Sequence, residues 1–176
     1  MKNYPRTPDG RHFIVNGRKW RSTDPAIPEP LRQQLVNVLM KARGDVGGAK
    51  RAKDEAAEKA ARKRVNDAKI ALGERGEKWW EPYTDAGLRS RISSTLFTLL
   101  RGREADKSIC PSEVARCIGA GESWRELMPT VREVAAELAK QNVLNITRGN
   151  DVLDPDAPGG GPIRLRRGAA FEGFGA

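Results

Sequence analysis

The side chains most able to do chemistry in this chain are basic ones in its second half, on a predicted helix and on the strands that follow it. Arginine and lysine bind phosphate groups, and arginine can also hydrogen-bond guanine in the major groove of DNA. We predict that these basic residues contact nucleic acid, mainly through phosphates. The candidates are Arg125, Arg132, Lys140, Arg148, Arg164, Arg166 and Arg167. Glu126, Glu133 and Glu137 lie beside them on the helix and would oppose phosphate binding.

Residue types suited to catalysis or metal binding are scarce. Cys110 and Cys117 do not form a metal-type pair, and the only histidine, His12, lies far from both in the sequence. The three glycines at 159–161 precede a predicted strand instead of a helix, which argues against a phosphate-cradling nucleotide loop. We therefore expect no enzyme activity, no cofactor, no metal and no small-molecule substrate.

The charge of the chain is strongly basic and unevenly distributed. The net charge is +9, and residues 1–87 contribute 19 basic and 12 acidic side chains to it. A basic chain is compatible with nucleic acid, an anionic membrane or an acidic protein as its partner. No segment approaches the ~20 consecutive apolar residues of a membrane span, and the two thiols suit a reducing compartment. We expect a soluble, cytoplasmic protein without membrane contact.

The elements of the first half are a short hairpin and a pair of helices. Two β-prone runs within residues 11–21 flank Asn16-Gly17, a dipeptide typical of tight hairpin turns, and Trp20 is the expected anchor of this hairpin. Apolar positions then predict helices over residues 31–46 and 49–72, antiparallel and separated at Gly47-Gly48. The second helix is rich in basic residues and has a narrow stripe of small side chains.

Two features of this half have alternative interpretations. Trp79 and Trp80 either cover the helical pair or the hairpin, or form an exposed partner-binding site, because tryptophan is enriched at interaction hot spots. The basic run at residues 59–64 is either a solvated helix face or a phosphate-contacting patch.

The second half shows the order of helices and strands that is typical of a winged helix. Helices are predicted at residues 85–101, at 111–118, and from Ser123, where Glu126 suggests a capping box and Pro129 a break before the regular helix. Strands at 143–147 and 163–166 would form the β-hairpin wing. The predicted fold class is mainly α with small β. Its parts are a hairpin and basic helical pair (1–83), a linker (84–87), a winged helix (88–168) and a flexible tail (169–176).

Several motifs in order carry a resemblance to known families. The motifs CPSEVAR at 110–116, WRELMPTVR at 124–132 and GPIRLRRG at 161–168 resemble the bacterial domain of unknown function 3253. This resemblance covers about residues 88–168 and implies a winged-helix-like fold, without catalytic residues. The motifs GRKWRSTDPAIP at 17–28 and AKIALGERGEKWW at 68–80 are similar to small bacterial proteins labelled biopolymer transporter Tol. Without a membrane segment, no transport role is expected.

The functional prediction is a non-enzymatic binding module for DNA or RNA. In this hypothesis the winged helix makes the contacts and the basic helical pair assists. The alternative is a protein–protein interaction adaptor that uses the winged helix or the Trp79-Trp80 region.

Overall fold

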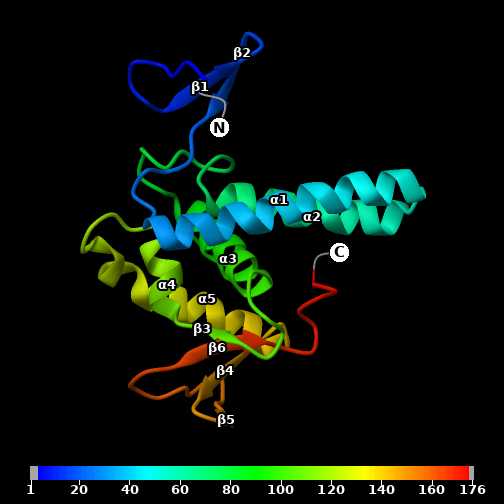
Figure 1. Cartoon of the computed structure of the whole chain (residues 1–176). Helices are drawn as coiled ribbons and strands as arrows, with labels where there is room; N and C mark the ends of the chain where they lie inside the picture. The colour runs from blue at the N-terminus through cyan, green and yellow to red at the C-terminus, as the bar shows by residue number, and fades with distance from the viewer. Residues whose placement is uncertain (1–3, 175–176) are drawn as a thin grey trace.

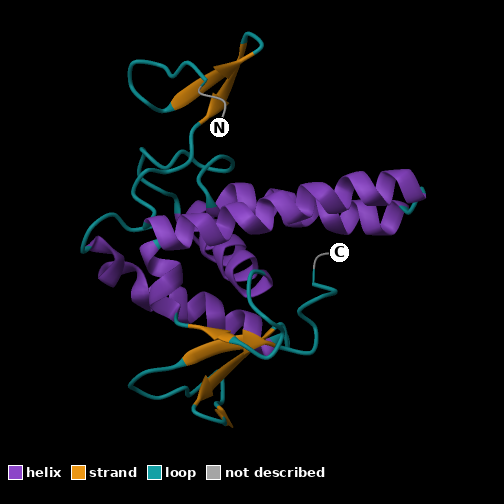
Figure 2. Ribbon diagram, viewed as in Figure 1, coloured by secondary structure: helices purple, strands orange, loops and turns teal. Residues whose placement is uncertain are grey.

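The computed structural model describes residues 4–174, which are mainly helical with two small antiparallel sheets, as predicted (Figures 1 and 2). The elements of the first half are β1 (His12–Val15), β2 (Arg18–Arg21), α1 (Glu29–Ala52) and α2 (Glu55–Ala71). Those of the second half are α3 (Asp85–Arg101), β3 (Ser108–Ile109), α4 (Pro111–Arg116), the 3₁₀ helix η1 (Ser123–Leu127), α5 (Met128–Lys140), β4 (Leu144–Arg148), β5 (Asp151–Val152) and β6 (Arg164–Arg167). No helix among these is long and apolar enough to cross a membrane.

The N-terminal hairpin forms at the predicted turn. Asn16 and Gly17 have φ angles of 48° and 73°, the left-handed values that a two-residue hairpin turn requires. Trp20, the predicted anchor of the hairpin, is 41% exposed, and the ammonium group of Lys69 on α2 lies 5.4 Å from its ring centroid. The hairpin is also held through His12, whose ring meets that of Trp80 edge-on at 5.4 Å.

The two long helices form an antiparallel pair, but its turn is not at Gly47-Gly48 as predicted. Helix α1 continues through the glycines to Ala52, and the chain reverses at Lys53, which adopts a left-handed φ of 56°. The Asp54 carboxylate then accepts a hydrogen bond from Ala57 N at 2.9 Å and caps α2. Glycine lowers helix propensity without abolishing it, so the stronger capping signal at Asp54 determines the turn.

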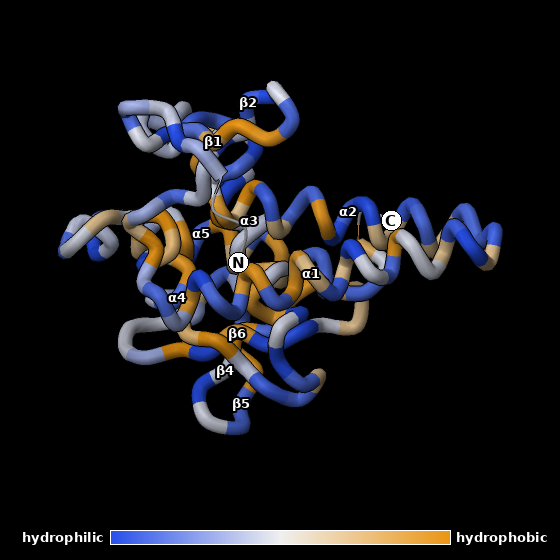
Figure 3. The backbone as a smooth tube through the Cα atoms, turned by 45° about the horizontal axis from the view of Figure 1, so that its top comes forward, coloured by the Kyte–Doolittle hydropathy of each residue, from blue (hydrophilic) through white to orange (hydrophobic). Residues whose placement is uncertain are grey.

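The distal part of this pair, residues 40–64, protrudes from the body and is called the helical arm below (Figure 1). Its 13 residues of α1 extend for about 20 Å at the rise of an α-helix. Ala49 and Ala61 are the buried side chains near its tip, so the helices approach closely with little apolar surface between them. Most residues of the arm are hydrophilic, as the hydropathy colours along the backbone in Figure 3 show.

Replacing Gly44 or Gly48 by alanine is expected to stabilise the protein by about 1 kcal/mol per site, because alanine has the higher helix propensity. A Cβ atom at either position would have no atom within 4 Å, so no steric cost offsets the gain. The free energy of unfolding from urea titration measures the effect. A loss of stability in either variant would contradict the continuous helix.

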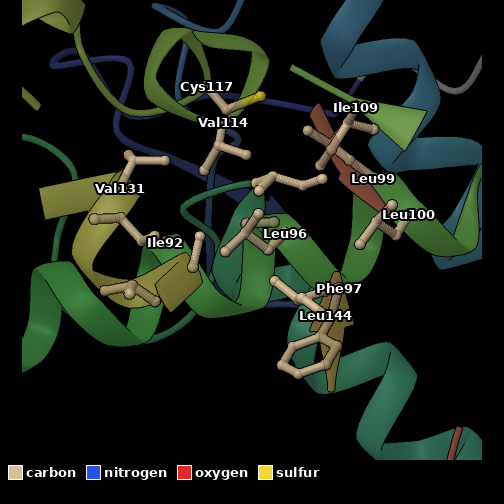
Figure 4. Packing of buried hydrophobic residues seen from close by; sticks show 14 of the residues in the cluster. Ile92, Leu96, Phe97, Leu99, Leu100, Ile109, Val114, Cys117, Val131 and Leu144 are labelled. Carbon is tan, nitrogen blue, oxygen red and sulfur yellow. The ribbon is translucent and has the colours of Figure 1, made fainter. Parts of the chain in front are cut away.

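The hydrophobic core is continuous between the two halves of the chain. Helix α3 lies at its centre, and its Ile92 and Leu96 are fully buried together with Leu35 of α1 and Leu72 at the end of α2. Figure 4 shows how the α3 side chains pack against those of α4, α5 and the sheet. Residues 84–87, predicted as a linker, form the start of α3, where Thr84 caps the helix by accepting from Gly87 N at 3.0 Å.

A buried ion pair also joins the two halves. The guanidinium of Arg91 on α3 donates to the Asp24 carboxylate at 2.8 Å, and the two side chains are 2% and 4% exposed. Arg91 also donates to the carbonyl of Cys117 at 3.2 Å and to the Tyr83 hydroxyl. The remaining Asp24 oxygen accepts from Ala26 N at 2.9 Å. The pair therefore fixes the loop before α1 against α3 and α4.

The second half consists of α3, α4 and α5 packed on a four-stranded sheet of order β3-β6-β4-β5. Strands β4 and β6 are antiparallel, with Ile146 opposite Leu165 and both side chains in the core. The predicted break at Pro129 is confirmed, because η1 changes to α5 at Met128. The predicted capping box at Ser123 is wrong, since its hydroxyl donates to the carbonyl of Ala120 at 2.7 Å.

Residues 169–174 are held by packing instead of forming the predicted flexible tail, and the last two residues of that predicted tail, 175 and 176, lie outside the described residues. Phe171 is 1% exposed, and its ring lies 5.4 Å from that of Phe97 on α3. Phe174 stacks on the same Phe97 ring at 5.5 Å. The described residues after β6 thus extend the core beneath the helical arm (Figure 1).

Candidate nucleic-acid interface

Two of the predicted binding residues, Arg132 and Arg148, hold the loop between β5 and β6. Arg132 of α5 donates to the carbonyl of Gly161 at 3.1 Å. Arg148 of β4 donates to the carbonyls of Pro158 and Gly160 at 3.0 and 2.5 Å. These two guanidinium groups satisfy backbone acceptors, so they position the loop and have fewer donors left for a ligand.

The three predicted arginines of β6 lie on two different faces of the sheet. Leu165 points into the core, so the alternation of a strand places Arg164 and Arg166 on the outer face. Arg164 donates to the hydroxyl and the carbonyl of Ser108, both at 3.0 Å. Arg167 points to the other side, where it donates to the carbonyl of Leu100 at 2.8 Å. The structure therefore does not gather the three arginines into one patch.

The remaining two candidates, Arg125 and Lys140, are exposed at opposite ends of the third helical segment. Arg125 pairs with Glu122 and stacks over the Trp124 ring at 4.6 Å. Lys140 pairs with Asp156 in the loop before β6, and the hydrogen bond and charge of this carboxylate raise the pKa of the lysine. Both cations are already matched by a carboxylate.

The exposed face of α5 is close to neutral. Arg89 of α3 donates to the carboxylates of Glu133 and Glu137, at 2.9 Å in each case, and to Asp85 at 3.1 Å. The two glutamates that would repel phosphate are thus paired with a cation from another helix. The face is neither a continuous basic surface nor an apolar one.

The helical arm carries the largest group of unpaired cations. Residues 40–64 contain nine basic and four acidic side chains. Three of the basic ones, Arg62, Lys63 and Arg64, pair with carboxylates. Among residues 4–174, no carboxylate oxygen lies within 4 Å of the other six, which are exposed: Lys41, Arg43, Lys50, Arg51, Lys53 and Lys59.

The basic run at residues 59–64 was predicted to be either a solvated helix face or a phosphate-contacting patch, and three of its four basic side chains pair with carboxylates. The unpaired cations at the tip, Lys50, Arg51 and Lys53, were not among the predicted site residues, because the turn was predicted at Gly47-Gly48. Asp54, a residue type that is typical of helix N-caps, is the sequence signal that could have located the tip.

Trp79 and Trp80 are half-buried and contact the N-terminal hairpin and the loop that follows it. The indole of Trp79 donates to the carbonyl of Ser22 at 3.1 Å, and the two rings meet edge-on at 5.0 Å. The guanidinium groups of Arg11 and Arg21 lie over the Trp80 ring at 5.1 and 5.7 Å. Both tryptophans therefore have a structural role in covering the hairpin.

The two cysteines differ in exposure, and no group of three metal-binding side chains occurs among the described residues. Burial raises the pKa of the Cys117 thiol from its ordinary value of 9.0 to about 12, although the Arg91 charge opposes the shift. The folded state thus favours the neutral thiol, so its contribution to stability is complete below pH 9 and is lost as the pH rises towards 12.

Iodoacetamide at pH 8 is expected to alkylate Cys110, which is partly exposed, and to leave Cys117 unmodified in the folded protein. Peptide mass spectrometry would measure both sites, with a urea-unfolded sample as the control in which both react. Rapid labelling of Cys117 in the folded protein would contradict its burial.

Comparison with known proteins gives a match for the second half of the chain. Residues 89–168, from α3 to the end of β6, match the family model described as "Protein of unknown function (DUF3253)". This confirms the resemblance that the motifs of that half indicate. No curated protein matches the chain. The resemblance of the N-terminal half stays a prediction.

Proposed function

We propose that this protein binds nucleic acid, with the helical arm as its principal phosphate-contacting element and the C-terminal half, as a winged helix, adding further contacts. The observation that carries the proposal is the set of six exposed, unpaired cations on the arm. When such cations bind a phosphate backbone, they displace its counterions. No ion pair within the protein has to break first.

The shape of the arm favours phosphate contact over base readout. The major groove is about 12 Å wide and admits one helix of about 10–12 Å diameter. Two helices side by side, as in the arm, are too wide to enter it. We infer binding that depends little on sequence, in which Lys50, Arg51 and Lys53 contact the backbone.

Two other partners suit a basic surface less well here. Membrane-surface helices need an apolar face, and Met40 is the one large hydrophobic side chain that is exposed on the described arm. A protein adaptor that uses Trp79 and Trp80 would require rings that are free, whereas both already cover the hairpin. Nucleic acid therefore remains the better-supported partner.

Fluorescence anisotropy with a labelled 20-base-pair duplex and a single strand of equal length tests the proposal. We expect the logarithm of the association constant to fall linearly as the logarithm of the salt concentration rises. The slope should be about −0.9 for each duplex phosphate that the protein contacts. The variant Lys50→Glu, Arg51→Glu, Lys53→Glu should lower both affinity and slope. A larger loss in Arg125→Glu would place the main contacts on the winged helix, and no binding of either probe at low salt would refute the proposal.

A further inference from the structure

The N-terminal hairpin has one covered edge and one open edge. On the side of β1, Ile14 N–H donates to the carbonyl of Pro5 and Thr7 N–H donates to that of His12, both at 2.9 Å. The segment that precedes β1 therefore pairs with this edge. Strand β2 forms the other edge of the hairpin, which Figure 1 shows standing apart from the long helices.

The backbone groups of Lys19 and Arg21 point out of the open edge. Because Ile14 N–H points away from β2, its pair with Lys19 is of the kind that exchanges no hydrogen bonds, and so is the pair of His12 with Arg21. The N–H and C=O groups of Lys19 and Arg21 therefore point away from β1. Among residues 4–174, no group forms a hydrogen bond with them.

The edges of the four-stranded sheet are shorter. Its edge strands, β3 and β5, have two residues each, whereas β2 has four. Strands that pair stably usually have at least about three residues. Of the open edges in the described part of the chain, that of β2 is thus the one long enough to pair with a further strand.

Apolar side chains are exposed around this edge. Among residues 4–174, five large hydrophobic side chains are exposed, and three of them belong to the hairpin or the segment before it: Tyr4, Ile14 and Trp20. Trp20 is exposed although the cations of Arg18 and Lys69 lie 5.6 and 5.4 Å from its ring centroid. Exposed apolar side chains that cluster in this way are typical of interaction sites.

The charges and backbone groups of β2 indicate the chemistry of the partner. Arg18 and Lys19 are exposed, and no carboxylate oxygen of residues 4–174 lies within 4 Å of either. Like charges opposite each other destabilise a sheet, which disfavours pairing of two copies of this edge. A phosphate backbone supplies acceptors only, whereas the edge presents both N–H donors and C=O acceptors. A peptide strand with acidic side chains matches both the cations and the backbone groups.

We propose that the open edge of β2 binds an extended acidic segment of a partner protein, which adds a strand to the hairpin. The segment exchanges backbone hydrogen bonds with Lys19 and Arg21, as in other complexes formed by β-strand addition. Its side chains alternate between the two faces, so an acidic residue lies opposite Lys19 and an apolar residue opposite Trp20. This site lies outside the helical arm and does not depend on the function proposed for the arm.

A labelled synthetic peptide of alternating glutamate and valine, about eight residues long, tests the proposal by fluorescence anisotropy with the full chain. We expect saturable binding, and none of a matched peptide of alternating lysine and valine. Lys19→Ala removes the cation and keeps the outward N–H, so it should weaken binding about threefold. Lys19→Pro removes both and should weaken binding about tenfold, because an edge strand tolerates proline where its N–H faces solvent.

Hydrogen exchange followed by NMR locates the bound peptide. Exchange at the N–H groups of Lys19 and Arg21 should slow on binding. The N–H of Trp20 faces β1 and should stay protected in Lys19→Pro, which shows that the hairpin of this variant is folded.

Equal losses in Lys19→Pro and Lys19→Ala would overturn the proposal, because they would reduce the interaction to charge alone. So would the absence of saturable binding, or binding that is lost in the arm variant Lys50→Glu, Arg51→Glu, Lys53→Glu. Peptide binding that this arm variant retains separates the hairpin site from the arm.

Discussion

Replacing Asp24 by asparagine is expected to lower the free energy of unfolding by about 3–5 kcal/mol, the cost of leaving one member of a buried ion pair without its partner. Arg91 is 2% exposed and cannot lose its proton, so its charge would stay buried. Asparagine keeps the shape of the side chain and the acceptor for Ala26 N, so the loss reports the charge of Asp24 together with its hydrogen bond from Arg91. Urea denaturation followed by circular dichroism measures the change.

An exposed ion pair supplies the control for this prediction. Glu29 and Arg32 are 65% and 43% exposed, so Glu29→Gln should cost less than about 1 kcal/mol. The double variant Asp24→Asn, Arg91→Met should recover part of the loss, because it leaves no unpaired buried charge. An Asp24→Asn variant as stable as the parent would show that the pair does not couple the two halves.

Replacing Gly168 by alanine is expected to destabilise the protein by about 3 kcal/mol, at the upper end of overpacking costs. The added Cβ would lie 2.2 Å from the carbonyl oxygen of Asn142 and within 3 Å of two backbone carbons. Backbone cannot rotate away as a side chain can, so the strand end must shift. The shift would break the bond from Gly168 N to the carbonyl of Val143, now 2.9 Å long.

Gly173 of the same segment is the matched control, because a Cβ there would have no atom within 4 Å. Gly173→Ala should therefore leave the free energy of unfolding within a few tenths of a kcal/mol of the parent value. Limited proteolysis offers a second measurement, since displacement of the segment in Gly168→Ala would free Phe171 and expose cleavage sites. Equal stability of the two variants would contradict the packing at the end of β6.

Features fixed by neighbouring residues were predictable from the sequence. Asn16-Gly17 specifies its turn through the φ angles that these residues tolerate, and Pro129 ends one helical geometry and begins another. The period of apolar residues located α3 correctly, from Asp85 to Arg101. In each case the decisive interaction spans a few residues, so local preference and final structure agree.

Features fixed by distant contacts were not predictable in this way. Arg91 and Asp24 are 67 positions apart, and no local pattern marks either as buried. Likewise, Arg132, Arg148 and Arg167 appear in the sequence as free cations, but tertiary packing places backbone carbonyls within their reach. The cations without carboxylate partners lie on the helical arm instead, because its helices extend beyond the rest of the protein.

The continuous core has a consequence for the segment that matches the family model. A fragment that begins at residue 89 would keep Ile92 and Leu96 but lose Leu35 and Leu72, which cover them. It would also leave the positive charge of Arg91 without the Asp24 carboxylate. We therefore expect the matched segment to depend for its stability on residues 24–72, which lie outside the match.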